Sequence, residues 1–168
     1  YPMPTVALIS GHAFAGGCIL AMYHDYRIMN PSRGFCCLNE LDFGANLHAA
    51  MSSIFRQKLS HDVYKSMVLE TRRYTGPQAL EAGIVDKLGD FSDVVALVEE
   101  RNLASRPSSG VYGTTKSEMY RETLGYIDGY NDIEEKTKVL TLENERREKI
   151  EKERVEAWRK NASIKSKL

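Results

Sequence analysis

The feature that most constrains the fold of this chain is a short apolar segment that runs directly into a turn of small residues. Residues 5–9 read Thr-Val-Ala-Leu-Ile, and residues 11–17 read Gly-His-Ala-Phe-Ala-Gly-Gly. A brief apolar run that ends at small residues is typical of a buried strand, and a strand this apolar normally lies inside a parallel sheet. The apolar stretch from about Cys18 to His24 then predicts a helix directly after the turn.

Further short strands and helices follow this first unit. Residues 26–29 and 35–38 read as strands that are separated by a turn containing Pro31 and Gly34. The apolar positions of residues 47–59 recur at helical spacing. Ser60 is expected to cap the next helix, and we expect helices over residues 61–72, 77–82, 91–103, 113–127 and 137–160, with an extended piece at 84–86 and a linker at 105–110. The order strand, helix, strand, strand predicts the α/β fold class.

Charge is unevenly distributed along a chain whose total balances. The 23 basic and 23 acidic residues cancel, so composition gives no reason to expect binding to nucleic acid or to an anionic membrane. Residues 1–69 contain nine charged side chains, whereas residues 134–168 contain nineteen. The core is therefore expected in the N-terminal part, and we expect no membrane span.

Two segments suggest a chemical role. The N–H groups of Gly16 and Gly17 would begin a helix without intrahelical partners, and such donors suit an oxygen that gains negative charge. A carboxylate, Glu40, follows the apolar segment at 35–38. Taken singly, a carboxylate at a strand end is more often a salt-bridge or capping residue, and a glycine is more often part of a tight turn. The histidines and cysteines show no paired nucleophile and base and no metal-ligand spacing, so we predict no metal site.

Four linked motifs resemble the crotonase (enoyl-CoA hydratase/isomerase) superfamily. They are residues 4–18, 25–27, 38–44 and 74–86, which occur in the family's order and spacing. Within the superfamily, the match to the delta(3)-delta(2)-enoyl-CoA isomerases is the closest. The resemblance implies a ClpP/crotonase spiral fold with C-terminal helices. It also implies that the fold is incomplete at its N-terminus, because the family has strands and loops before the position of Tyr1.

The resemblance also implies roles for individual residues. Gly16 would supply one backbone donor to the thioester oxygen of an acyl-CoA, and Gly17 would leave room for its close approach. In the family the second donor lies before the position of Tyr1. Hydratases of the family use two glutamates, whose positions here are Ile19 and Glu40. A single carboxylate suits the transfer of one proton from the α to the γ carbon, which favours an isomerase.

The acyl group is expected to contact Leu38, Leu41 and Phe43, and Asp42 is a minor candidate for a second acid. We expect no cofactor, because acyl-CoA is the substrate, and the family implies a homo-trimer. Two alternatives stay open: a hydratase or dehydratase of the same fold, and a truncated, non-catalytic paralogue that serves as an assembly or binding subunit.

Three parts are expected along the chain. Residues 1–104 would form the C-terminal part of a crotonase-like core, residues 105–136 a linker and helical region, and residues 137–168 a charged helix with a targeting tail. The tail, Ser166-Lys167-Leu168, has the form of a peroxisomal address that an import receptor reads. The sequence therefore predicts a peroxisomal location. The charged helix is most simply a solvated one, with trimer contacts or CoA phosphate binding as the alternatives.

Overall fold

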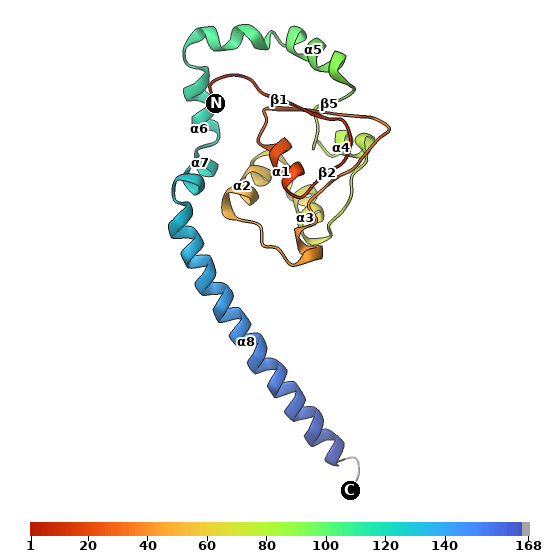
Figure 1. The fold of residues 1–168 in the computed structure, drawn as a ribbon, viewed down its shortest axis with the longest axis vertical. Helices are drawn as coiled ribbons and strands as arrows, with labels where there is room; N and C mark the ends of the chain where they lie inside the picture. The colour runs from red at the N-terminus through yellow and green to blue at the C-terminus, as the bar shows by residue number, and fades with distance from the viewer. Residues whose placement is uncertain (166–168) are drawn as a thin grey trace. The chain divides into compact units, whose positions relative to one another are not determined.

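The computed structural model describes the backbone of residues 1–165 and the side chains of residues 1–160. It contains two units, residues 1–128 and the segment from Gly129 onward (Figure 1). The strands are β1 (Val6–Ile9), β2 (Ala13–Phe14), β3 (Tyr26–Met29), β4 (Cys36–Cys37) and β5 (Lys87–Leu88). The α-helices are α1 (Gly16–Met22), α2 (Ala49–Lys58), α3 (His61–Leu69), α4 (Gly76–Glu81), α5 (Phe91–Glu100), α6 (Tyr112–Met119), α7 (Arg121–Asp128) and α8 (Tyr130–Lys165). Two 3₁₀ helices are η1 (Glu40–Phe43) and η2 (Leu103–Ser109).

The first unit is built on parallel strands. β1, β3 and β5 form a three-stranded sheet with β3 in the centre, and Val6 of β1 lies opposite Tyr26 of β3. β2 and β4 form a separate parallel pair in which Phe14 lies opposite Cys37. Parallel strands need crossover connections, which helices supply here. The α/β class predicted from the sequence is therefore confirmed.

Helices cover both faces of the three-stranded sheet. Met29 of β3 belongs to the main core, to which α1, α2, α3 and α4 contribute. The preceding residue, Ile28, packs instead with Leu97 of α5 and with Leu103. Successive strand residues point to opposite faces, so β3 is buried on both sides. Figure 1 shows α5 and the group of α1, α2 and α3 on opposite sides of the strands.

Several local predictions are confirmed. The strand at 26–29 has the expected bounds. The Ser60 side chain accepts a hydrogen bond from the Val63 N–H at 3.4 Å, as expected for the cap of α3. The Thr75 N–H donates to the Gln78 side chain at 3.0 Å in a capping box, and Gly83 follows α4 with a φ of +71°. The two helix ends depend only on residues a few positions apart, which explains why the sequence reveals them.

Two predicted segments between 84 and 110 are wrong. Residues 84–86 are not extended, because the N–H groups of Ile84 and Val85 both donate to the Ala79 carbonyl, at 2.8 and 3.2 Å. The Asp86 N–H already donates to Arg27 O at 2.8 Å, and the strand β5 begins at Lys87. The expected linker at 105–110 is mostly the 3₁₀ helix η2. The helix before it, α5, ends at Glu100 instead of 103, since Asn102 adopts a left-handed conformation with a φ of +50°.

Helix boundaries differ elsewhere. The helix expected from about Cys18 begins at Gly16, because the Ile19 N–H already donates to the Ala15 carbonyl at 3.0 Å. The single helix expected over 113–127 is two helices, α6 and α7, which are separated at Tyr120. The last helix, expected over 137–160, spans Tyr130–Lys165.

The described part of the second unit is formed almost entirely by α8. Its side chains through residue 160 are mostly exposed. Glu148 and Lys152 form one of its ion pairs, at 3.8 Å and four residues apart. Exposed pairs of this kind add only about 0.3–0.5 kcal/mol each. Among residues 1–165, no helix combines the length and the apolar character needed to cross a bilayer.

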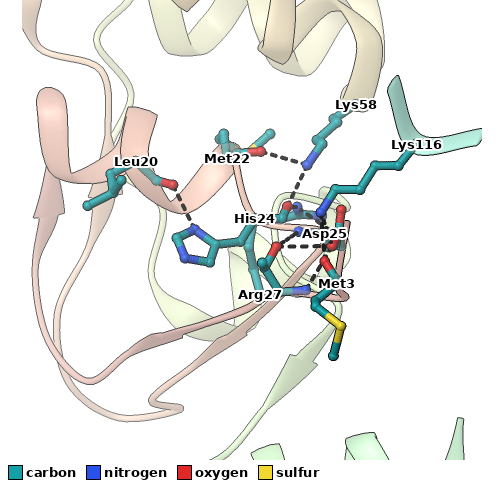
Figure 2. Close-up of polar contacts among 9 residues, drawn as sticks. Met3, Leu20, Met22, His24, Asp25, Arg27, Lys58 and Lys116 are labelled. Atoms are coloured by element: carbon teal, nitrogen blue, oxygen red, sulfur yellow. Dashed lines mark hydrogen bonds and ion pairs between the residues drawn. The ribbon is translucent and has the colours of Figure 1, made fainter. Parts of the chain in front are cut away.

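The C-terminal end of α1 is held by basic side chains (Figure 2). Lys58, the last residue of α2, donates to the carbonyl oxygens of Met22 and His24 at 2.6 and 2.5 Å. The Arg27 guanidinium also donates to His24 O at 3.0 Å and pairs with Asp86 at 3.1 Å. Cations near the final carbonyls of a helix stabilise it. These contacts fix the position of α1, the helix that follows the glycine turn.

Burial, with a smaller contribution from the Arg27 charge, lowers the pKa of Lys58 to about 8. The unfolded chain keeps this proton up to a pKa of about 10.4. The unfolded state thus binds more protons at this side chain between these values, and the contribution of Lys58 to the free energy of unfolding, taken as the difference between the parent and Lys58→Met, should rise as pH increases from about 8 towards 10. We expect a slope below about 1.4 kcal/mol per pH unit, because Lys58 is only half-buried. Urea unfolding at pH 7.5, 8.5 and 9.5 measures it.

Lys58→Met should remove this rise, whereas Lys65→Met should keep it. Lys65 is a suitable control because it lies on the neighbouring helix α3 and forms only an exposed pair with Asp62 at 3.6 Å. The measurements should stay below pH 10. Burial raises the pKa of Tyr120 to about 12, and this tyrosine therefore removes stability as pH rises above 10. An identical slope in the parent and in Lys58→Met would contradict the assignment.

Candidate active site

The glycine turn connects β2 to α1. Its main-chain strain falls on Ala15, which has a φ of +46°, while Gly16 and Gly17 are the first two helical residues. The N–H groups of a first helical turn have no acceptor within the helix. A Cβ atom added to Gly16 or Gly17 would meet nothing within 4 Å. The protein's own packing therefore does not require glycine at these two positions, and the space beside them is open.

Glu40 is the first residue of η1 and is 8% exposed. Within residues 1–160, its Oε2 and the Oδ1 of Asn39 are the two buried side-chain polar atoms without a hydrogen-bond partner. The main-chain carbonyl of Glu40 accepts from the Ala45 N–H at 2.9 Å, which holds the loop after η1 against it. A buried carboxylate oxygen without a partner is costly and is typical of a functional position.

The pairing of β2 with β4 brings these two elements together. The Ala13 N–H donates to Phe35 O at 2.8 Å, and the Ala15 N–H donates to Cys37 O at 3.0 Å. Ala15 directly precedes Gly16, and Glu40 comes three residues after Cys37. The turn and the buried carboxylate therefore belong to adjacent segments that main-chain hydrogen bonds hold in register.

A cavity of about 180 Å³ lies beside Glu40. Its lining comes from the residue after β4, from η1, from the loop that follows η1 and from α3: Leu38, Glu40, Leu41, Ala45, Asn46, Leu47, Val68 and Leu69. Of the three residues expected to contact an acyl group, Leu38 and Leu41 line this cavity. Phe43 does not line it and is 60% exposed.

The sequence did not single out the wall formed by Ala45, Val68 and Leu69. Residues 61–72 were recognised only as a helix, and contact between this helix and η1 depends on tertiary packing. A second, larger groove of about 370 Å³ runs along β1 and α1 and includes Gly17. The two predicted elements thus border different cavities: Gly17 lines the groove along β1, and Glu40 lines the cavity beside α3.

Other titratable residues nearby have structural partners. The Thr71 hydroxyl donates to the exposed Asp42 at 3.1 Å. Cys18 and Cys36 are buried with their Sγ atoms 2.9 Å apart. The hydrogen bond between Cys18 and Cys36, followed by burial, raises the pKa of Cys18, and burial raises that of Cys37. These thiols therefore stay neutral near pH 7.

Comparisons with known proteins agree with this architecture. The family model described as enoyl-CoA hydratase/isomerase matches residues 1–122. "Enoyl-CoA delta isomerase 1, peroxisomal" of Arabidopsis thaliana is 36% identical over 133 residues, which are 76% of this chain and 55% of that protein. "Enoyl-CoA delta isomerase 2, peroxisomal" of the same plant is 34% identical over 132 residues, 75% of this chain and 55% of the relative.

A solved structure shows the same relationship. The probable enoyl-CoA hydratase EchA3 of Mycobacterium tuberculosis superposes with a TM-score of 0.67 at 25% identity. The superposition covers 84% of this chain and 62% of that one. The chain spans about 55% of the length of the two curated relatives. The crotonase-like fold inferred from the four motifs is confirmed, and the chain belongs to the enoyl-CoA hydratase/isomerase family.

Proposed function

We propose that this chain carries the proton-transfer residue of an enoyl-CoA isomerase, which moves a double bond from the 3- to the 2-position of an acyl thioester. The observation that carries the proposal is the buried Glu40 carboxylate, whose Oε2 faces no protein partner among the described residues and which borders a mainly apolar cavity. The names of the two Arabidopsis relatives support the same reaction.

The position of Ile19 favours isomerisation over hydration. The resemblance places the first acid of a hydratase there, but Ile19 is 6% exposed and belongs to the main core. Addition of water needs one group to activate the water and another to protonate the α carbon, whereas a double-bond shift needs one group that carries one proton. Glu40 by itself can carry the one proton that a double-bond shift needs.

The proposed reaction moves one proton and no other atom. Glu40 removes a proton from the α carbon, and the electron pair delocalises onto the thioester oxygen. The Gly16 N–H donates to this oxygen, whose negative charge grows as the proton leaves. Protonated Glu40 then returns the proton to the γ carbon, and the double bond moves into conjugation with the thioester. The carboxylate is regenerated.

A second donor to the thioester oxygen belongs to the proposal for the whole protein. Removing one such donor typically costs about 10²–10³-fold in turnover. The chain covers about 55% of its isomerase relatives, so full activity is proposed for the protein that contains the complete fold. A version extended upstream should therefore turn over faster than the 168-residue chain, by about this factor if it supplies the second donor.

Transfer of an isotopic label tests the proton shuttle. 3-Hexenoyl-CoA deuterated at the α carbon should give conjugated 2-hexenoyl-CoA in which part of the deuterium is found at the γ carbon. The same base then removes and returns the label, and NMR of the product measures its position. A 3-hydroxyacyl-CoA formed from 2-hexenoyl-CoA would instead identify a hydratase. Absence of both reactions in the extended protein would identify a non-catalytic paralogue.

We also propose a peroxisomal location and assembly into a homo-trimer. The names of the two Arabidopsis relatives include the word peroxisomal. The proposed signal, Ser166-Lys167-Leu168, lies outside the described residues. A fluorescent protein fused to the N-terminus of the chain should enter peroxisomes through the import receptor, and removal of these three residues should leave it in the cytosol.

A further inference from the structure

We propose that the cavity beside Glu40 holds the hydrocarbon tail of the acyl group as far as about carbon 10, the limit beyond which added carbons gain no further affinity. This inference rests on the function proposed above. The cavity walls are mainly leucine and valine side chains. Leu41 and Leu69, which border the cavity, are 59% and 66% exposed. Exposed leucines beside a buried carboxylate without a partner form a surface that a bound apolar group would cover.

The volume sets the length of the tail. An apolar cavity of about 150 Å³ binds benzene, a molecule of six carbons. The cavity beside Glu40 measures about 180 Å³, so it holds about six carbons with little space left. Carbons 1 to 4 of the substrate are occupied by the thioester and the reacting positions. The tail therefore begins at carbon 5 and fills the cavity at about carbon 10.

Ala45 is the wall residue best placed to set this limit. It lies in the loop after η1, it is exposed, and its φ is not positive. A larger side chain there brings neither a core clash nor backbone strain, and the hydrogen bond from its N–H to Glu40 O is unaffected. Ala45→Leu adds three carbons to the wall. Wall and tail carbons share one cavity volume, so the limit on the acyl tail should shorten by about three carbons.

Val68, in a different element, allows the limit on acyl length to be tested in the opposite direction. It lies on α3 and is half-buried. Val68→Ala removes two carbons from the wall, so the limit should move about two carbons further along the chain. Ala45→Ser, which keeps the wall nearly constant in size, is the control for Ala45→Leu.

Calorimetric titration of the 168-residue chain with saturated acyl-CoAs of four to sixteen carbons measures the limit. These thioesters cannot isomerise, so binding is read without turnover. The dissociation constant should fall by about fourfold for each added methylene until the cavity is full, and then stay constant. The change of slope is expected at about ten carbons in the parent and in Ala45→Ser, at about seven in Ala45→Leu, and at about twelve in Val68→Ala.

Four results would overturn the tail site. The first is an unchanged break point in both Ala45→Leu and Val68→Ala, and the second is an affinity that keeps rising through sixteen carbons. The third is no measurable binding. The fourth is an affinity that does not depend on acyl length, which is expected if a second copy of the chain covers Leu41 and Leu69. The proton shuttle is judged separately. Full isomerisation by Glu40→Gln with a shifted break point in Ala45→Leu would reject the shuttle and retain the tail site.

Discussion

Glu40→Gln is expected to lower isomerisation of a 3-enoyl-CoA by about 10²–10⁴-fold, the usual contribution of a positioned general base. Glutamine keeps the size and the polarity of the side chain but cannot accept the α proton. Its amide also removes a buried carboxylate without a partner, so the folded state should not lose stability. Turnover of 3-hexenoyl-CoA, followed through the absorbance of the conjugated product, measures the effect.

Asp42→Asn is the matched control for this variant. Asp42 lies two residues further along η1, is exposed, and accepts a hydrogen bond from Thr71 at 3.1 Å. The same change from carboxylate to amide there should alter turnover by less than about twofold, a barrier change below about 0.4 kcal/mol. Equal losses in the two variants would mean that general electrostatics, and not proton transfer by Glu40, controls the rate. A Glu40→Gln protein with parental turnover would reject the mechanism.

Gly34→Ala is expected to reduce the free energy of unfolding by about 2–5 kcal/mol, from backbone strain together with overpacking. Gly34 has a φ of +93°, which side chains rarely adopt, and an added Cβ would lie 2.2 Å from the carbonyl carbon and oxygen of Gly11. Backbone atoms cannot move aside as the end of a flexible side chain can. The segment that would be displaced leads directly into the glycine turn, so activity should fall together with stability.

Gly83→Ala separates the effect of backbone strain from the effect of overpacking. Gly83 also has a positive φ, +71°, but a Cβ there would meet nothing within 4 Å. Only the conformational cost of about 1–2 kcal/mol should remain. Urea unfolding of both variants gives the comparison, and similar losses in the two would show that the approach of Gly34 to Gly11 does not contribute.

The fold could be predicted from the sequence where the determinants are local. The Ser60 cap and the turn at Gly83 each depend on neighbours a few residues apart. Segments whose structure depends on distant partners were predicted less well. Residues 84–86 read as an extended piece because Ile84 and Val85 are apolar, but Ala79 holds these two residues in a turn and the paired strand β5 begins at Lys87.

The candidate site divides in the same way. The motifs led to Glu40 and to the glycine turn, and the structure buries the first and opens space beside the second. Neither the placement of the turn's strain on Ala15 nor the α3 wall of the cavity could be read from the sequence. The first depends on the hydrogen bond between Ala15 and Cys37, and the second on how α3 packs near η1.

The burial of Ile19 has an evolutionary consequence. It lies 6% exposed in the main core, at the place where the resemblance puts the additional acid of water-adding relatives. An Ile19→Glu change would have to desolvate a carboxylate among closely packed apolar side chains, a change that usually costs several kcal/mol. Gain of a new reaction by this lineage would therefore require compensating substitutions throughout its interior, and the packing of the scaffold acts as a barrier to functional divergence.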